Sequence, residues 1–313
     1  MSEKALISGS LAYDVIMRFP GRFSDHILAD RIHSLSVAFM VTDLRREFGG
    51  CAGNIAYTLM LLGDEALPVG AAGKDFAAYA ERLDELGISR RHIKRLDDAF
   101  TAQAFINTDD DGNQITAFHP GAMSRAHEQP LPTGTGAAIG IVAPDGRDAM
   151  IQRAEAFHAA GIPFIFDPGQ GLPMFGETEL ITFMDQADWL AMNDYEAGMF
   201  SKTTHLKLKE VAKQVKAMIV THGAEGSSIY VDGEEIAIPA VQPNALVDPT
   251  GCGDAYRAGL LHGMLHRYDW ETTGRIASLA GSIKVASQGT QNHLFTTEEF
   301  AARFEAAFGY RYA

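Results

Sequence analysis

Two aspartates enclose a glycine-rich stretch toward the end of the chain, Asp248-Pro-Thr-Gly-Cys-Gly-Asp254, and apolar residues at helical spacing follow it. Backbone N–H groups at the start of a helix lack internal partners and lie at the positive end of the helix dipole. The backbone of Gly251, Cys252 and Gly253 is therefore suited to bind an anion, phosphate above all. Asp254 would add a carboxylate that could take a proton from a hydroxyl during phosphoryl transfer. The alternative is that both aspartates only cap a tight turn.

A second glycine-rich stretch, Phe48-Gly-Gly-Cys-Ala-Gly-Asn54, also precedes an expected helix. Its two adjacent glycines would let a ligand approach the backbone closely. Asn54 offers a hydrogen-bond donor and an acceptor, which suits a polyol. The small residues could instead serve close packing of the helix on a strand. Asp14 joins the same hypothesis because it lies just beyond the first expected strand, Lys4 to Ser10, at the edge where open α/β sheets bind ligands.

The order of the expected elements predicts the fold class. From about residue 138 onward, strands alternate with helices, which is typical of a doubly wound, mostly parallel α/β sheet. Two earlier segments, at about 12–47 and 100–119, do not fit this alternation and are expected to form a small β lid. The second contains a hairpin that turns at Asp109 to Asn113. No linker rich in Pro, Gly or Ser divides the chain, so residues 1–313 are expected to form one domain.

The composition argues against several classes of protein. Of 313 residues, 46% are hydrophobic, and 26 basic against 40 acidic residues give a formal charge of −14. A negative surface repels nucleic acid and anionic membranes, so neither is an expected partner. No N-terminal targeting segment or membrane-spanning apolar run is recognised. The two cysteines, Cys51 and Cys252, form neither a metal pair nor a disulfide framework, and a cytoplasmic location is expected.

Three other patterns suggest ligand sites, but their spacing is wrong. Gly70-Ala-Ala-Gly-Lys-Asp75 looks like a phosphate loop, yet Pro68 stands where the first glycine should be and Asp75 replaces Ser or Thr. Asn107 to Gly112 begins like a calcium loop, but Phe118 occupies the position of the bidentate Glu. Gly9-Ser-Leu-Ala12 follows the first strand in place of G-x-G-x-x-G, which argues against a dinucleotide-binding dehydrogenase.

The two glycine-rich stretches together resemble the paired motifs of the ribokinase-like (PfkB) sugar and nucleoside kinases. These are Gly49-Gly-x-x-x-Asn54 near the start and Asp248-x-Thr-Gly-Cys-Gly-Asp254 near the end. Asn193-x-x-Glu196 is similar to the N-x-x-E element of the family, and Val220-Thr-His-Gly-Ala-Glu-Gly226 to its V-T-x-G-x-x-G segment. The resemblance spans nearly the whole chain. It implies a ribokinase-like fold and a kinase that uses ATP and Mg²⁺.

The resemblance also implies roles for the matching residues. Asp254 would be the general base, and Gly251, Cys252 and Gly253 would form the anion hole for the γ-phosphoryl group. Ribose hydroxyls would be bound by Asp14, Gly49, Gly50 and Asn54. Mg²⁺ and phosphate would be organised by Asn193 and Glu196, with Glu196 acting through water. The ATP groove would be lined by Thr221, Gly223 and Gly226. The lid would exclude water from the reaction.

Two departures from the family motif concern cofactors and thiols. Pro249 replaces the usual Thr and lacks an N–H, which leaves open whether a monovalent cation such as K⁺ binds there. Cys252 replaces the usual Ala but keeps its backbone N–H. Because it lies near a helix N-terminus, its thiol is expected to favour the thiolate. Modification of Cys51 or Cys252 should then inactivate the protein unless ligands protect it; the alternative is that both cysteines are buried and inert.

The expected substrate is a nucleoside, adenosine first, phosphorylated on its 5′-hydroxyl. The sequence around Cys51 and the stretch Phe118-His-Pro-Gly-Ala-Met123 are closer to bacterial and archaeal adenosine and nucleoside kinases than to ribokinase. Phe39, Met40 and Phe118 could cover a flat base, or the lid could pack on itself. A kinase of ribose or another furanose and a catalytically weak nucleoside sensor are the alternatives. Monomer and homodimer both stay open, since lid strands can pair across subunits.

Overall fold

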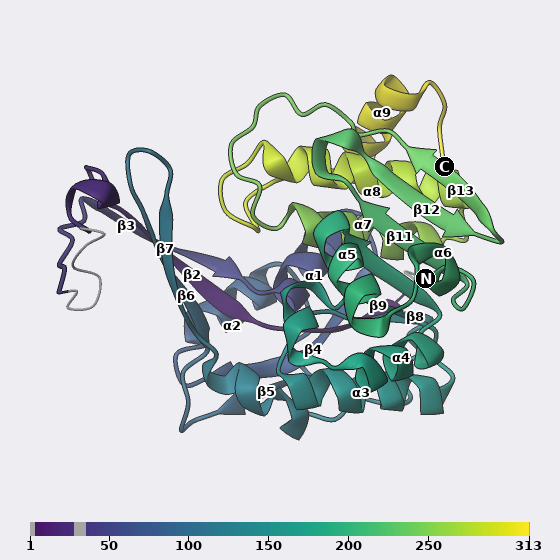
Figure 1. The fold of residues 1–313 in the computed structure, drawn as a ribbon, viewed down its shortest axis with the longest axis horizontal. Helices are drawn as coiled ribbons and strands as arrows, with labels where there is room; N and C mark the ends of the chain where they lie inside the picture. Colours follow the sequence, from purple (N-terminus) through teal and green to yellow (C-terminus); the bar gives the residue numbers. More distant parts are fainter. Residues whose placement is uncertain (1–3, 28–35, 313) are drawn as a thin grey trace.

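The centre of the molecule is a nine-stranded sheet (Figure 1). In the computed structural model, which describes residues 4–27 and 36–312, its strand order is β13-β12-β11-β10-β9-β8-β1-β4-β5. All neighbours pair in parallel except β11–β12 and β12–β13, so the predicted mostly parallel sheet is confirmed. The strands are β1 (Lys4–Ser8), β4 (Glu65–Gly73), β5 (Ile93–Leu96), β8 (Ile139–Val142), β9 (Phe164–Phe166), β10 (Trp189–Asn193), β11 (Ala217–Thr221), β12 (Ser227–Val231) and β13 (Glu234–Ile238).

Helices cover both faces of this sheet, which is why its central strands are continuous apolar runs. One face packs against α1 (Cys51–Leu61), α2 (Ala77–Glu85), α7 (Cys252–Leu265) and α8 (Trp270–Val285). The other packs against α3 (Arg147–Ala160), α4 (Glu177–Gln186), α5 (Asp194–Thr204) and α6 (Leu208–Val211). Helix α9 (Thr297–Phe308) packs on α8 in a separate apolar cluster. The described residues also form the 3-10 segments η1 (Phe23–Asp25), η3 (Gly121–Glu128), η4 (Gly169–Met174) and η5 (Gly223–Glu225).

A smaller four-stranded sheet projects beside the main body, in the order β3-β2-β6-β7 (Figure 1). Its strands are β2 (Ala12–Arg18), β3 (Asp43–Gly49), β6 (Ala102–Thr108) and β7 (Gln114–His119). These strands come from the two segments expected to form a lid, of which residues 28–35 lie outside the described part. The predicted hairpin is present: β6 and β7 are antiparallel, and Asp109 Oδ1 accepts the N–H groups of Asp111 and Asn113.

The stretch that looks like a phosphate loop lies instead at the end of strand β4. A Cβ on Gly73 would lie 2.1 Å from the carbonyl carbon of Phe100, so glycine is needed where two backbones approach closely. Asp75 then accepts hydrogen bonds from Thr101 N at 2.7 Å and Gln103 Nε2 at 3.0 Å. This carboxylate ties the start of β6 to the main sheet. Across the described ranges, no helix is both long enough and apolar enough to cross a membrane.

Candidate active site

The two glycine-rich stretches meet where helices α1 and α7 begin, because these helices pack side by side. Asn54 Nδ2 donates a hydrogen bond to Asp254 Oδ2 at 2.8 Å. Each helix is entered through a glycine with positive φ, Gly50 at 87° and Gly251 at 79°. A Cβ on Gly50 would lie 2.6 Å from the backbone of the β1–β2 turn, so only glycine fits there.

Asp254 has the electrostatic environment of a group that changes protonation near neutral pH. Burial, helped by the charge of Asp167, raises the pKa of Asp254 to about 7, although the Asn54 hydrogen bond and the charge of Arg257 act in the opposite direction. A carboxylate that must give up much of its hydration is a stronger proton acceptor than one in water. The ionised form is therefore suited to act as a general base.

A buried ion pair lies one turn further along α7. Arg257 donates from Nε to Asp167 Oδ2 at 3.1 Å and from Nη2 to Oδ1 at 3.2 Å. Both side chains are buried, and Asp167 directly follows β9 at the carboxyl edge of the sheet. Sequence reasoning noted Asp167 only as the end of a strand and missed Arg257. The available signal was its position three residues after Asp254, on the same side of the helix.

Asn54 is held in one orientation by a buried polar network. Gln291 Nε2 donates to Asn54 Oδ1 at 3.0 Å and lies 2.7 Å from the hydroxyl of Tyr79, which itself donates to the carbonyl of Gly49 at 2.9 Å. With its oxygen occupied by Gln291, the Asn54 amide presents its NH₂ group to Asp254. The sequence did not predict Gln291 or Tyr79, since neither belongs to a motif.

Asp14 lies on β2, close to the start of α1. A Cβ on Gly49 would lie 2.7 Å from Asp14 Oδ2, so the carboxylate sits directly against this glycine. Burial raises the pKa of Asp14 to about 6, with Asp248 and Glu47 adding negative charge. The structure thus brings Asp14, Gly49 and Asn54 to the same edge of the main sheet, where a ligand could reach all three.

The loop before α7 rests on a buried lysine. Lys284 is 0% exposed, and its ammonium donates to the carbonyl oxygens of Asp248 at 2.7 Å and Ser287 at 3.1 Å. The Asp248 carboxylate accepts the N–H groups of Thr250 and Gly289 at 2.9 Å each. Although burial raises its pKa, these hydrogen bonds hold the pKa of Asp248 below its usual value. Asp248 is therefore structural support, and Lys284, which the sequence motifs do not indicate, adds positive charge behind the loop expected to bind an anion.

The thiol next to this loop does not favour the thiolate, so that expectation is wrong. Burial raises the pKa of Cys252 to about 11, and the charge of Lys284 offsets this only in part. Burial also raises the pKa of Cys51 well above its ordinary value, and Asp254 adds to the effect. The helix N-terminus is a weaker influence here than the loss of hydration.

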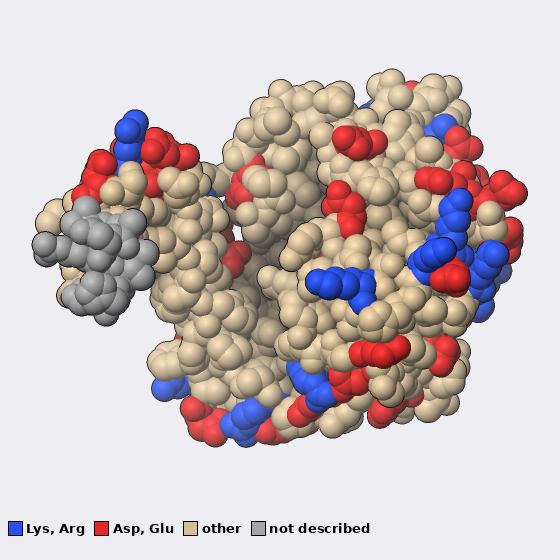
Figure 2. Space-filling view, in the orientation of Figure 1, with Lys and Arg blue, Asp and Glu red and all other residues tan. Residues whose placement is uncertain are grey.

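A cavity of about 480 Å³ lies beside the loop that precedes α7, and its lining includes no residue of the small sheet. It contains three predicted residues of the ATP groove, Thr221, Gly223 and Gly226, together with Cys252 and Gly253. The rest of its lining is Ala224, Ala240, Val241, Gln242, Pro243, Leu246, Pro249, Tyr256, Ser278, Gly281, Ser282 and Val285. A hollow between the small sheet and the main body is visible in Figure 2, with acidic side chains at its rim.

The Asn193-x-x-Glu196 element forms a capping box at the start of α5. Asn193 Oδ1 accepts the N–H of Glu196, and Glu196 Oε2 accepts the N–H of Asn193, both at 2.8 Å. Burial raises the pKa of Glu196, with Asp167 adding to the effect. Within the described ranges, Glu196 Oε1 accepts no hydrogen bond from protein. One carboxylate oxygen is thus left for a Mg²⁺-bound water, which fits an ion that keeps most of its waters.

The side chains expected to cover a base lie in different surroundings. The Phe39 ring lies 4.9 Å, centroid to centroid, from those of Phe19 and Phe23, which is the packing expected of a lid that packs on itself. Met40 is 84% exposed. Phe118, on β7, is 48% exposed, and its contact with substrate stays a prediction.

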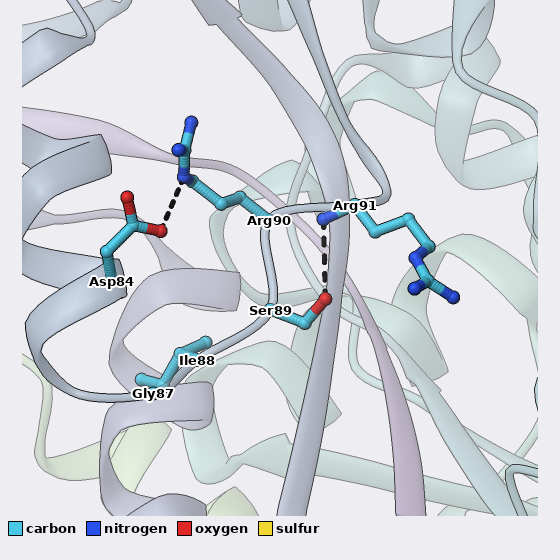
Figure 3. Close-up of a pocket in the computed structure, with 6 residues that line it drawn as sticks. All are labelled: Asp84, Gly87, Ile88, Ser89, Arg90 and Arg91. Carbon is cyan, nitrogen blue, oxygen red and sulfur yellow. Dashed lines mark hydrogen bonds and ion pairs between the residues drawn. The ribbon is translucent and has the colours of Figure 1, made fainter.

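A second cavity, of about 560 Å³, is unrelated to these residues (Figure 3). It lies at the turn after α2, where Arg90 Nε donates to Asp84 Oδ1 at 2.6 Å. Its lining is Asp84, Gly87, Ile88, Ser89, Arg90 and Arg91. It contains none of the predicted site residues.

Residues 17–297 match the family described as pfkB family carbohydrate kinase. The chain therefore belongs to this family, and the ribokinase-like membership predicted from its motifs is confirmed. It is 32% identical to the nucleoside kinase of Methanothermobacter thermautotrophicus over 97% of this chain and 96% of that protein.

Solved structures of nucleoside kinases have the same fold. One is the Burkholderia thailandensis nucleoside kinase in complex with inosine, 48% identical with a TM-score of 0.90 over 98% of this chain and 99% of that chain. Its complex with ADP-inosine is 49% identical with a TM-score of 0.87, covering 98% and 97%. The nucleoside kinase of Methanocaldococcus jannaschii, an archaeal member of the ribokinase family, is 29% identical with a TM-score of 0.89, covering 97% and 98%.

Proposed function

We propose that the protein transfers the γ-phosphoryl group of ATP to the 5′-hydroxyl of a nucleoside, with adenosine as the first candidate. The observation that carries this proposal is the 2.8 Å hydrogen bond between Asn54 and Asp254. A hydroxyl bound to Asn54 would lie beside the carboxylate and the backbone N–H groups at the start of α7. The inosine bound to the Burkholderia nucleoside kinase supports a nucleoside over a free sugar.

In the proposed reaction, ionised Asp254 accepts the proton of the substrate hydroxyl. The hydroxyl oxygen then forms a bond to the γ-phosphorus, the bond to the β-phosphate oxygen breaks, and ADP leaves. The backbone N–H groups of Gly251, Cys252 and Gly253 would stabilise the charge on the transferred group. When bound, Mg²⁺ supplies positive charge that neutralises the phosphates, and Glu196 would hold it through water.

Lys284 bears on the question of a monovalent cation. Its ammonium already donates to the carbonyl oxygen of Asp248, next to Pro249. A fixed positive charge at this place would serve the same electrostatic purpose as a bound ion. We therefore propose that the reaction does not depend on K⁺.

The test is a substrate panel with ATP and either adenosine, inosine, ribose or fructose-6-phosphate. Both nucleosides are expected to be phosphorylated, adenosine with the highest kcat/KM. If ribose is the one good acceptor, the nucleoside assignment is refuted. If inosine is preferred to adenosine, the nucleoside assignment stands and only the choice of adenosine is refuted. Tight nucleoside binding without turnover would favour the sensor. Sedimentation of the same preparation would decide between a monomer and a homodimer paired through the lid.

A further inference from the structure

A cluster of metal-binding side chains lies at the opposite ends of α1 and α7 from Asn54 and Asp254. His262 Nδ1 is 2.7 Å from Asp64 Oδ2, and His266 Nε2 is 2.9 Å from Asp64 Oδ1. One possible ligand atom from each of the three residues lies within 4.8 Å of the others. None of the roles proposed for the reaction uses these residues.

The fold brings the three side chains close together. His262 and His266 are four residues apart on α7, so they project from the same face of the helix. Asp64 follows Gly63, whose φ of 96° ends α1 and turns the chain toward β4. Eight residues separate His262 from Asp254, about 12 Å along a helix axis. The cluster is therefore remote from phosphoryl transfer.

The donor set is that of a transition-metal site. Two imidazole nitrogens and one carboxylate oxygen are common ligands of Zn²⁺ and similar ions. Asp64 and His262 are 7% and 6% exposed, whereas the His266 side chain is 36% exposed and gives an ion a route from solvent. Within residues 4–27 and 36–312, the buried Nε2 of His262 has no hydrogen-bond partner. No hydrogen bond therefore fixes this ring from its other side.

The spacing needs only a small adjustment. Ligand atoms around a tetrahedral Zn²⁺ with bonds of about 2.0–2.2 Å lie roughly 3.3–3.5 Å apart. The two nitrogen-to-oxygen distances here are 2.7 and 2.9 Å, as expected while protons occupy the place of the ion. Replacing those protons by a dication would lengthen each nitrogen-to-oxygen distance by roughly 0.4–0.8 Å. The two imidazole nitrogens, which lie within 4.8 Å of each other, would come to a similar separation.

We propose that Asp64, His262 and His266 bind one transition-metal dication of the Zn²⁺ type, with water completing the coordination. The ion would join the turn after α1 to the end of α7. These two helices are already joined at their other ends by the Asn54–Asp254 hydrogen bond. The metal would thus stabilise the helix pair that carries the active site without taking part in the reaction.

The experiment uses full-length protein without an affinity tag, treated with a chelator that is then removed. Zn²⁺ is titrated by calorimetry, Co²⁺ by visible absorption, and the melting temperature is measured with and without Zn²⁺; no ATP or nucleoside is present. We expect one ion per chain, a Co²⁺ spectrum of low-coordinate type and a rise of several degrees in Tm. These readouts stand whatever the substrate panel shows.

Variants decide whether the ion occupies this cluster. His266→Ala, at a partly exposed position, should fold normally, bind Zn²⁺ more than about tenfold more weakly and lose the rise in Tm. Asp64→Asn should weaken binding in the same way. The matched control is His158→Ala, an exposed histidine on α3 that should leave binding unchanged. Absence of saturable one-to-one binding, or equal affinity in wild type and His266→Ala, would overturn the proposal.

Discussion

Replacing Asp254 by Asn tests the proposed base and the burial of its carboxylate together. The variant keeps the size of the side chain and can still face Asn54, but it cannot accept a proton. Because a positioned base contributes about 10²–10⁴-fold in rate, kcat should fall by that factor while ATP still binds. In the wild type, kcat/KM should rise with pH through about 7, the pKa to which burial raises Asp254, since only the ionised form accepts a proton.

The same substitution should stabilise the fold. The pKa of Asp254 is about 7 in the folded protein against an ordinary value of 3.8. At about 1.4 kcal/mol per pH unit, this difference of roughly 3 units corresponds to at most ~4 kcal/mol, less where solvent reaches the side chain. Because the folded pKa is raised, the contribution of Asp254 to the free energy of unfolding is complete below the unfolded pKa and is lost as pH rises through the folded pKa. The variant side chain carries no charge at any of these pH values, so the variant does not lose this free energy of unfolding.

The difference in free energy of unfolding between D254N and wild type should therefore grow from about pH 4 to about pH 7 and then stay constant. Urea denaturation of both proteins at pH 5 and pH 8 measures it, and steady-state kinetics from pH 6 to pH 9 give the activity. Asp97→Asn, at an exposed position, is the matched control and should change neither property. Near-normal turnover would refute the base, and a variant less stable than wild type at pH 8 would refute the argument from burial.

Four further outcomes are expected from the surroundings of the site residues. Lys284→Met removes a charged donor to two carbonyl oxygens and should lower kcat/KM for ATP about 10–100-fold. Exchanging Na⁺ for K⁺ in the wild-type assay should leave kcat unchanged. Activation by K⁺ would contradict the proposal that the reaction does not depend on this ion. Gln291→Ala releases the Asn54 amide and should raise KM for the nucleoside about tenfold but not KM for ATP, as initial rates at varied concentrations of each would show. Because burial raises the pKa values of Cys51 and Cys252, iodoacetamide should inactivate the protein slowly at pH 7 and faster as pH rises; rapid loss of activity at neutral pH would mean that a thiolate is present.

The sequence predicts that a helix follows each glycine-rich stretch, because glycine before an apolar run has few structural interpretations, although α1 begins at Cys51, four residues before the Ile55 expected. Gly50 and Gly251 need a positive φ, and each directly precedes the first residue of its helix. The regular alternation of strands and helices after about residue 138 likewise predicts the mostly parallel main sheet, since the buried strands there can be recognised as short apolar runs. The antiparallel hairpin is equally local, because Asp109 closes its own turn.

Features that depend on distant contacts could not be predicted. Strand β4 contains Pro68 and several Gly and Ala residues, and it is extended because β1 and β5 pair with it on either side. Gln291 and Lys284 acquire their roles from partners that only the fold supplies. For the Cys252 thiol, its position near a helix start predicts a lowered pKa, but burial has the larger effect and raises that pKa.

The Asn54–Asp254 hydrogen bond joins residues 200 positions apart, which has a consequence for synthesis of the chain. At about 5–20 residues per second, the ribosome completes α1 roughly 10–40 s before Asp254 is made. Throughout this interval Ile55 and Leu59, which are fully buried in the finished protein, lack the helix that covers them. A nascent chain halted in this interval would expose an apolar helix face and bind no phosphate at α7. Its fate would then depend on chaperones and proteases, because exposed apolar surface favours aggregation.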